Sequence, residues 1–315
     1  MLKLDKGCVM ANKIMIIGTG NVGSSIAYAM LNQQTDVNEL ILVDIDTADA
    51  EGEVMDLCDA LVTTPNFIKI KAGTYADAKD CDIIIITAGV AQQPGETRMD
   101  LLAKNALIFK NISSNIMSNH FSGIILVVSN PLDVLTYLTW HYTGLPTEQV
   151  IGSGTVLDSA RLCFRIAKRL GVSPRSVHAL QVGEHGDTEF ALWSSAEVSG
   201  QLVSELINHT ELSRIEADAR NRAYEIIDRK GATYYGIGAC VTQIVNCILE
   251  DECRVLPVSN YDYATGIYNS FPAVVSRQGI TRRLDLKLSE SELYKLQTST
   301  NLIKASIGEA LRLTT

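Results

Sequence analysis

Near the middle of the chain one histidine lies between glycines and acids, in the segment Gly183-Glu184-His185-Gly186-Asp187. An imidazole titrates near neutral pH, so His185 is suited to act as a general acid or base. The glycines on either side leave its ring open to close approach. A polar turn with an unused histidine would have the same composition, so the assignment depends on which other residues orient the ring.

Four other segments carry polar or charged residues that could act together with this histidine. They are Gln92 to Arg98, Ser129-Asn130-Pro131, Asp158 to Arg161, and Lys230 to Thr233. The first two follow predicted strands, at the end where a parallel sheet binds its ligands. Asp158 and Arg161 lie one turn apart on a predicted helix, so their side chains share one face.

The elements that position these residues alternate in the first half of the chain. Apolar runs rich in β-branched residues are predicted as strands over 13–17, 39–43, 68–72, 83–87, 123–128 and 150–151. Continuous apolar strands separated by helices indicate a parallel sheet that is covered on both faces. The predicted fold is therefore α/β, a doubly wound parallel sheet of the Rossmann type.

The alternation fades after Gly152, where a long helical pattern runs from Ser153 to Leu170. The later elements are predicted as strands over 177–182 and 198–199, helices over 212–228, 234–249 and 289–313, and a β-rich stretch over 254–279. We therefore predict two domains, a dinucleotide-binding domain over residues 1–152 and a mixed α+β catalytic domain over residues 153–315.

The glycine run Gly18-Thr19-Gly20-Asn21-Val22-Gly23 joins the first predicted strand to a helix predicted from Ser24 to Gln33. In this position the glycines let a pyrophosphate approach the backbone N–H groups at the positive end of the helix dipole. Asp44 ends the second strand, where a carboxylate would accept both adenosine ribose hydroxyls. Because that carboxylate would repel a ribose phosphate, the unit predicts NAD rather than NADP.

The composition describes an ordinary globular protein of 315 residues, with 46% hydrophobic and 20% charged residues. A formal net charge of −9 argues against nucleic-acid or anionic-membrane partners, because no basic excess exists to neutralise phosphates. No apolar run reaches the ~18 residues of a membrane span, and the segment Met1 to Asn12 does not resemble a signal peptide.

Seven cysteines are scattered along the chain without a Cys-x-x-Cys pair: Cys8, Cys58, Cys81, Cys163, Cys240, Cys247 and Cys253. This pattern predicts buried free thiols in a reducing cytoplasm rather than disulfides. The spacing of cysteines and histidines predicts no metal site.

With these motifs in this order, the chain resembles the L-lactate and malate dehydrogenase family from about Lys13 onward. The resemblance rests on the glycine run, Asp44, Gly95-Glu96-Thr97-Arg98, Ser129-Asn130-Pro131, Asp158-Ser159-Ala160-Arg161 and Gly183-Glu184-His185-Gly186-Asp187. It implies hydride transfer between NAD and a small 2-hydroxy or 2-oxo acid. It also implies a cytoplasmic homotetramer.

The resemblance assigns a role to each of these residues. His185 would exchange a proton with the substrate, and Asp158 would accept a hydrogen bond from its other ring nitrogen. Arg161 would hold the substrate carboxylate, Arg98 would polarise the carbonyl on loop closure, and Asn130 would add a hydrogen bond to the substrate. The cofactor-binding residues would be Gly18, Gly20, Asn21, Val22, Gly23, Asp44, Gly89, Ser129 and Asn130. Ordinary ion pairs are the alternative for the two arginines.

The substrate side chain is predicted from two further positions. Malate dehydrogenases of the family carry an arginine where this chain has Gln92, and an amide cannot balance a second carboxylate. Thr233 matches the threonine of lactate enzymes, so the preferred pair is L-lactate and pyruvate. Gln92 as a plain polar loop residue leaves malate or L-2-hydroxyisocaproate as alternatives, and a catalytically idle NAD-binding protein is the alternative of a different class.

One departure from the family pattern concerns regulation. Many bacterial lactate dehydrogenases bind fructose bisphosphate through an arginine and a histidine. His178 matches the histidine, but Cys163 stands where the arginine is expected. Because the guanidinium is the strongest phosphate contact, we expect weak or absent activation by this sugar phosphate.

Overall fold

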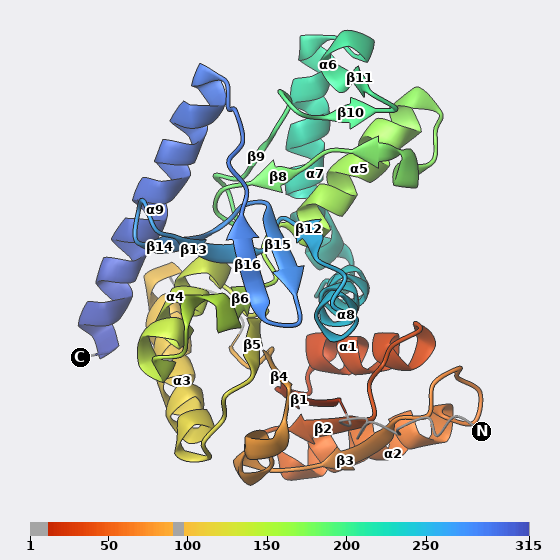
Figure 1. The fold of residues 1–315 in the computed structure, drawn as a ribbon, viewed down its shortest axis with the longest axis vertical. Helices are drawn as coiled ribbons and strands as arrows, with labels where there is room; N and C mark the ends of the chain where they lie inside the picture. Colours follow the sequence, from red (N-terminus) through yellow and green to blue (C-terminus); the bar gives the residue numbers. More distant parts are fainter. Residues whose placement is uncertain (1–11, 91–97, 315) are drawn as a thin grey trace, which may run out of the picture.

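The computed structural model describes residues 12–90 and 98–314, which form one large sheet, several small sheets and long covering helices (Figure 1). The strands of the large sheet are β1 (Lys13–Ile17), β2 (Glu39–Val43), β3 (Lys69–Ala72), β4 (Ile83–Ile86), β5 (Ile124–Val127), β6 (Val150–Gly152), β13 (Ser259–Asp262) and β14 (Ile267–Ser270). The short strands are β7 (Val177–His178), β8 (Gln181–Val182), β9 (Phe190–Ala191), β10 (Glu197–Val198), β11 (Gln201–Leu202), β12 (Arg254–Leu256), β15 (Ala273–Ser276) and β16 (Gly279–Arg283).

The helices connect and cover these strands. The α-helices are α1 (Asn21–Asn32), α2 (Thr47–Ala60), α3 (Arg98–Ser118), α4 (Leu132–Thr143), α5 (Val156–Leu170), α6 (Val203–Leu206), α7 (His209–Lys230), α8 (Tyr235–Leu249) and α9 (Glu290–Thr314). Short 3-10 helices are η1 (Tyr75–Asp80), η2 (Thr147–Gln149) and η3 (Pro174–Ser176). Within the described parts of the chain, none of these helices has both the length and the apolar character that crossing a membrane requires.

The large sheet has the strand order β14-β13-β6-β5-β4-β1-β2-β3, in which β1 to β6 are parallel. The order reverses between β1 and β4, which is where a doubly wound sheet binds its ligand. The predicted Rossmann-type sheet is therefore confirmed. β13 joins β6 in the antiparallel sense, with Ser259 opposite Gly152. The predicted division after Gly152 does not divide this sheet, and the domain boundary stays a prediction.

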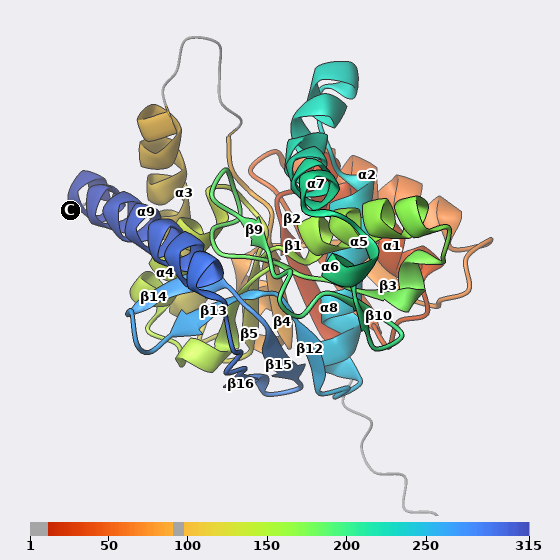
Figure 2. The same ribbon diagram turned by 90° about the horizontal axis from the view of Figure 1, so that it is seen from above.

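The second half of the chain also helps to cover both faces of the sheet. Along β1, Ile14 and Ile16 pack with α1 and α8, whereas Met15 and Ile17 pack with α3, α4 and α9. This alternation follows from the two-residue period of a strand. Figures 1 and 2 both show α8 beside α1 and α9 beside α3 and α4. Helices from both halves of the chain therefore pack on both faces of the large sheet, whose strand ends carry the predicted site residues.

Several predicted elements differ from the structure at their ends. α1 begins at Asn21 rather than Ser24, because Gly20 is already its N-cap. The strand predicted over 177–182 is two short strands, since β7 pairs with β10 and β8 pairs with β9. The final helix begins as expected. The Ser289 backbone N–H donates to Glu292 Oε2 at 2.8 Å, and the Glu292 backbone N–H donates to Ser289 Oγ at 3.3 Å, which forms a capping box.

The cysteines of the described residues are free thiols, as predicted. Cys81, Cys240 and Cys247 are buried, but Cys58 and Cys253 are exposed. The prediction of burial is wrong for these two, because one lies on the outer face of α2 and the other in the turn before β12.

Candidate active site

A cavity of about 610 Å³ lies at the carboxyl edge of the large sheet. Loops after β4, β5 and β8 line it together with α5 and α7. The predicted site residues in its wall are Val22, Gly89, Ser129, Asn130, Asp158, Arg161 and His185. The fold therefore brings together predicted site residues that are up to 163 positions apart in the chain, from Val22 to His185.

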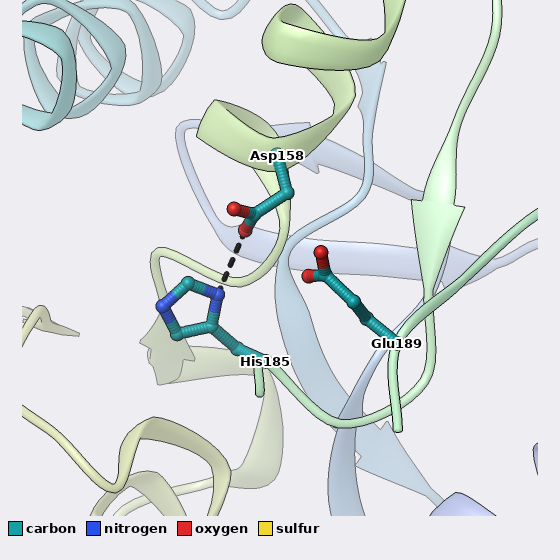
Figure 3. Close-up of side chains that lie close together, drawn as sticks. All are labelled: Asp158, His185 and Glu189. Atoms are coloured by element: carbon teal, nitrogen blue, oxygen red, sulfur yellow. Dashed lines mark hydrogen bonds and ion pairs between the residues drawn. The ribbon is translucent and has the colours of Figure 1, made fainter. Parts of the chain in front are cut away.

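Asp158 forms the centre of a three-residue cluster in this cavity. Its Oδ2 atom lies 2.8 Å from His185 Nδ1, and Figure 3 draws this contact as a dashed line. Its Oδ1 atom accepts a hydrogen bond from Arg161 Nη1, also at 2.8 Å. Asp158 and Arg161 are a turn apart on α5, whereas His185 comes from the loop after β8. One carboxylate therefore orients both an imidazole and a guanidinium toward the same space.

The surroundings of this cluster favour its charged forms. Burial by itself would lower the pKa of His185, but the charge and hydrogen bond of Asp158 outweigh it and raise the pKa to about 9. Burial likewise opposes the ionisation of Asp158, yet His185 and Arg161 keep the pKa of this carboxyl below its usual range. The imidazole is accordingly protonated at neutral pH, with its other ring nitrogen available to a ligand.

The loop that carries His185 is held from two sides. On one side Asp133 Oδ2, from the first turn of α4, accepts a hydrogen bond from the His185 backbone N–H at 2.7 Å. On the other side Ser299 Oγ of α9 accepts from the Glu184 N–H at 3.0 Å and donates to the Thr188 carbonyl at 2.9 Å. These contacts fix the backbone of the loop, so the imidazole does not depend on Asp158 alone for its position.

The glycine turn after β1 leaves room for a phosphate where a side chain would interfere. A Cβ atom on Gly20 would meet no described atom within 4 Å, and no described side chain caps this helix end. The backbone N–H groups of the first turn of α1 therefore remain open to an anion. Gly18 and Gly23 serve the turn itself, because a Cβ on Gly23 would lie 1.9 Å from the Gly18 carbonyl oxygen.

Asp44 closes the other side of this turn. Its Oδ2 accepts hydrogen bonds from the Thr19 N–H at 2.7 Å and from the Thr19 hydroxyl at 3.1 Å. These bonds keep the pKa of Asp44 below its usual value, although burial alone would raise it. The tip of β2 thus presents a carboxylate beside the glycine turn, and these residues fit the adenosine half of a dinucleotide.

The strand tips of β4 and β5 are tied together by Asn105 of α3. Its Oδ1 accepts from the Val90 N–H at 2.9 Å, and its Nδ2 donates to the Asn130 carbonyl at 2.9 Å. Ser129 Oγ donates to the Ala88 carbonyl at 2.7 Å. The segments with Gly89, Ser129 and Asn130 therefore form one continuous rim of the cavity.

Three of the residues predicted to be catalytic or to bind the substrate are not placed in the cavity by the structure. Thr233 lies between α7 and α8, half-buried, and is not among the described residues that line the cavity. Arg98 is the first residue of α3, but its side chain lies outside the described part of the chain. Gln92 also lies outside the described residues.

Four residues of this site were not predicted from the sequence. For Asp133 the sequence offered an indication, because an acid two residues after Pro131 is typical of the first turn of a helix. Glu189 follows His185 by four residues and is buried at 3% exposure in the cavity wall. Asn105 and Ser299 lie inside long helices, where the local pattern does not separate a functional side chain from a structural one.

A glycine turn and a cavity at the switch point of a Rossmann sheet are typical of proteins that bind a dinucleotide. The histidine and carboxylate pair in this cavity is suited to proton transfer. Two family models cover nearly the whole chain. The lactate/malate dehydrogenase NAD binding domain matches residues 12–152, and the lactate/malate dehydrogenase alpha/beta C-terminal domain matches residues 155–314. The chain belongs to the lactate/malate dehydrogenase family.

Individual relatives are similar to this chain over nearly its whole length. The chain is 45% identical to "L-lactate dehydrogenase 2" of Bacillus cereus, over 95% of this chain and 98% of the relative. A lactate dehydrogenase from a Medee basin deep-sea metagenome library has a TM-score of 0.93 and 44% identity, covering 96% of this chain and 99% of that one. The minor L-lactate dehydrogenase of Enterococcus mundtii in its ligands-bound form has a TM-score of 0.92 and 43% identity, covering 95% and 98%.

Proposed function

We propose that this protein is an NAD-dependent L-lactate dehydrogenase, which interconverts L-lactate and pyruvate. The observation that carries the proposal is the contact of Asp158 with both His185 and Arg161 inside one cavity, at 2.8 Å in each case. The identity to L-lactate dehydrogenases over nearly the whole chain supports the same conclusion.

In this proposal His185 moves the proton of the reaction. When bound, NAD would supply the hydride chemistry, giving a hydride to the carbonyl carbon of pyruvate or taking one from the hydroxyl-bearing carbon of L-lactate. Reduction of a ketone leaves an alkoxide, so the protonated imidazole donates a proton to the oxygen, and the neutral imidazole removes it in the reverse direction. Asp158 holds the ring in one tautomer and stabilises its charged form.

Arg161 is proposed to bind the carboxylate of the substrate. Its side chain is 10% exposed, and Nη1 is already engaged with Asp158. This bond directs the guanidinium into the cavity, where its remaining N–H groups match a carboxylate in a planar, two-pronged pair. Arg98 is proposed to polarise the carbonyl from the segment before α3, and Asn130 to add a hydrogen bond.

The cofactor is proposed to lie from the glycine turn to the rim of the cavity. Gly18, Gly20, Asn21, Val22 and Gly23 would hold the pyrophosphate against the start of α1. The carboxylate of Asp44 would bind the adenosine ribose, and this negative charge favours NAD over NADP. Gly89, Ser129 and Asn130 would lie near the nicotinamide half. The N-terminal family model, which is an NAD binding domain, supports this arrangement.

The substrate side chain is proposed to face Gln92 and Thr233. The test is NADH oxidation by the purified protein with pyruvate, oxaloacetate and 2-oxoisocaproate side by side. We expect the highest kcat/KM with pyruvate, because a neutral amide leaves the second carboxylate of oxaloacetate unpaired. Higher efficiency with oxaloacetate or 2-oxoisocaproate would favour a malate or L-2-hydroxyisocaproate dehydrogenase. Turnover of none of them would favour an idle NAD-binding protein.

The Gln92→Arg variant tests the role of this residue directly. Its guanidinium would pair with the second carboxylate, so the ratio of kcat/KM for oxaloacetate over pyruvate should rise about 10- to 100-fold, as for one charged hydrogen bond. Gln93→Arg is the matched control, with the same charge one residue on. An unchanged ratio in Gln92→Arg would show that residue 92 does not contact the substrate side chain.

Fructose bisphosphate is expected to activate this enzyme weakly or not at all. His178 is exposed on β7, but Cys163 Sγ points to the protein interior and lies 3.3 Å from the Ala179 carbonyl oxygen. No guanidinium is therefore available at residue 163 to bind a phosphate. Pyruvate reduction measured with increasing fructose bisphosphate checks this, and strong activation at limiting pyruvate would contradict it. A cytoplasmic location and a homotetramer also remain predictions from the resemblance.

A further inference from the structure

A second buried acid, Glu189, lies beside the pair of Asp158 and His185. The three side chains point toward one another in Figure 3, and one ligand atom from each lies within 4.8 Å of the other two. Glu189 is 3% exposed, which makes it as buried as Asp158. The mechanism proposed above uses Asp158 and His185 but assigns nothing to this third group.

The groups around Glu189 are of both charges. Glu189 lines the cavity described above and also a second cavity, of about 390 Å³, between its own loop, α7 and α9. The charged or titratable groups that line these two cavities or act on His185 are Asp158 and Arg161 of α5, Glu216, Arg220 and Tyr224 of α7, Lys295 and Tyr294 of α9, Asp133 of α4, and Glu184 and Asp187 of its own loop. Asp158 opposes a second negative charge, whereas His185, Arg161 and Arg220 favour it. The cations of Arg161 and His185 also make the cluster a poor metal site, so we assign it to proton binding.

The neighbour of Glu189 points to a protonated carboxyl. Gln181 is fully buried, and its Nε2 donates to Glu189 Oε1 at 3.3 Å. Its own Oε1 is also buried, and no hydrogen bond reaches it from the residues that the structure describes. The bond from Nε2 fits a carboxylate and a carboxylic acid alike, but only the acid also has a hydrogen to offer a neighbouring acceptor. Burial, followed by the charge of Asp158, raises the pKa of Glu189 to about 8.

We propose that Glu189 is a positioning residue that carries a proton beside Asp158 at neutral pH and determines how tightly His185 holds its own proton. The inference rests on the proposed function, because it concerns the proton that His185 passes to the substrate. Glu189 acts through the charge that it gains on losing its proton, not through contact with the substrate.

The direction of the effect follows from the charge that Glu189 gains when it loses its proton. The carboxylate then lies beside His185, with ligand atoms of the two side chains within 4.8 Å of each other, and its charge raises the pKa of His185. The new carboxylate then stabilises the imidazolium and raises the pH at which His185 loses its proton. Without Glu189, the pKa of His185 falls, and pyruvate reduction, which needs the imidazolium, declines at a lower pH.

The test replaces Glu189 by glutamine, which keeps the size and the hydrogen bond to Gln181 but cannot ionise. Histidine rings labelled with 13C are titrated by NMR in the full-length protein. The chain has five histidines, and the His185 signal is identified by its absence from H185Q. We expect its titration midpoint to be about one pH unit lower in E189Q, as for the loss of one charge at this separation. The alkaline limb of kcat/KM for pyruvate should move in the same direction.

E216Q is the matched control. Glu216 is also buried, but it accepts a hydrogen bond from Trp193 Nε1 at 2.9 Å and does not lie beside Asp158. Its His185 midpoint should equal that of the unmodified protein. An equal midpoint in E189Q, or an equal shift in E216Q, would overturn the inference. Since the NMR titration uses no substrate, it tests Glu189 independently, and absent pyruvate reduction would count against the proposed function alone.

A second measurement decides the question if E189Q does not fold. The carboxyl carbon of Glu189, labelled with 13C and assigned through its loss in E189D, should titrate near pH 8 in the unmodified protein. A midpoint below neutral pH would mean that Glu189 is ionised under working conditions, which contradicts the proposal.

Discussion

The His185→Gln variant is expected to reduce pyruvate with a kcat about 10²- to 10⁴-fold below that of the unmodified protein. A glutamine side chain can hydrogen-bond the carbonyl oxygen but cannot deliver a proton to the alkoxide. Steady-state NADH oxidation at saturating pyruvate measures the loss. The fold should survive, because Asp158 keeps its ion pair with Arg161 at 2.8 Å and no buried charge is left alone.

His178→Gln is the matched control for this substitution. His178 is exposed on β7 and does not line the cavity among the described residues. It should keep full activity in the absence of sugar phosphates. NADH binding, followed by fluorescence, should be retained by both variants, because the glycine turn and Asp44 are unchanged. A His185→Gln enzyme with nearly full kcat would show that another group supplies the proton.

The Arg161→Gln variant is expected to lower kcat/KM for pyruvate about 10²- to 10³-fold, with a marked rise in KM. Removing one partner of a buried, hydrogen-bonded charge pair costs about 2–5 kcal/mol, and each 1.4 kcal/mol is about tenfold. The guanidinium is also the group proposed to hold the substrate carboxylate, so binding suffers as well as chemistry. Initial rates over a range of pyruvate concentrations separate KM from kcat.

Arg165→Gln provides the matched control on the same helix. Arg165 lies one turn further along α5, and its Nη1 bonds Asp218 at 3.1 Å instead of Asp158. Its loss should leave KM for pyruvate unchanged. Thermal unfolding of both variants checks that any difference is not a loss of fold. If Arg161→Gln left KM unaltered, the substrate carboxylate would have to bind elsewhere.

Much of the fold was predictable because the pattern that encodes it is local. The apolar run from Ile14 to Ile17 shows by itself that a strand is buried on both faces, and the structure places alternate side chains in two separate cores. The limits of elements were less predictable. Where α1 begins depends on the turn before it, and Gly18 in that turn packs against Thr87 and Ala88, about 70 residues further along the chain, which no window of a few residues contains.

The relation of the two halves could not be read from the sequence. β13 and β14 follow a long helical region, yet they join the large sheet at β6, the last of its parallel strands. A β-rich stretch of the chain specifies that strands form but not which edge they join. That choice depends on where α8 and α9 cover the two faces, which is a matter of long-range packing.

Residue types and their order along the chain identify a glycine turn, an acid after β2, and a histidine between glycines, so the candidate site residues could be listed from the sequence. Which of these residues touch depends on the tertiary structure. His185 and Asp158 are separated by 27 residues and meet at 2.8 Å because α5 and the loop after β8 converge at one edge of the sheet. Glu189 shows this dependence most clearly. The sequence shows a glutamate four residues after His185, but its burial beside Asp158 depends on elements distant in the chain, and that burial is what raises the pKa of its carboxyl.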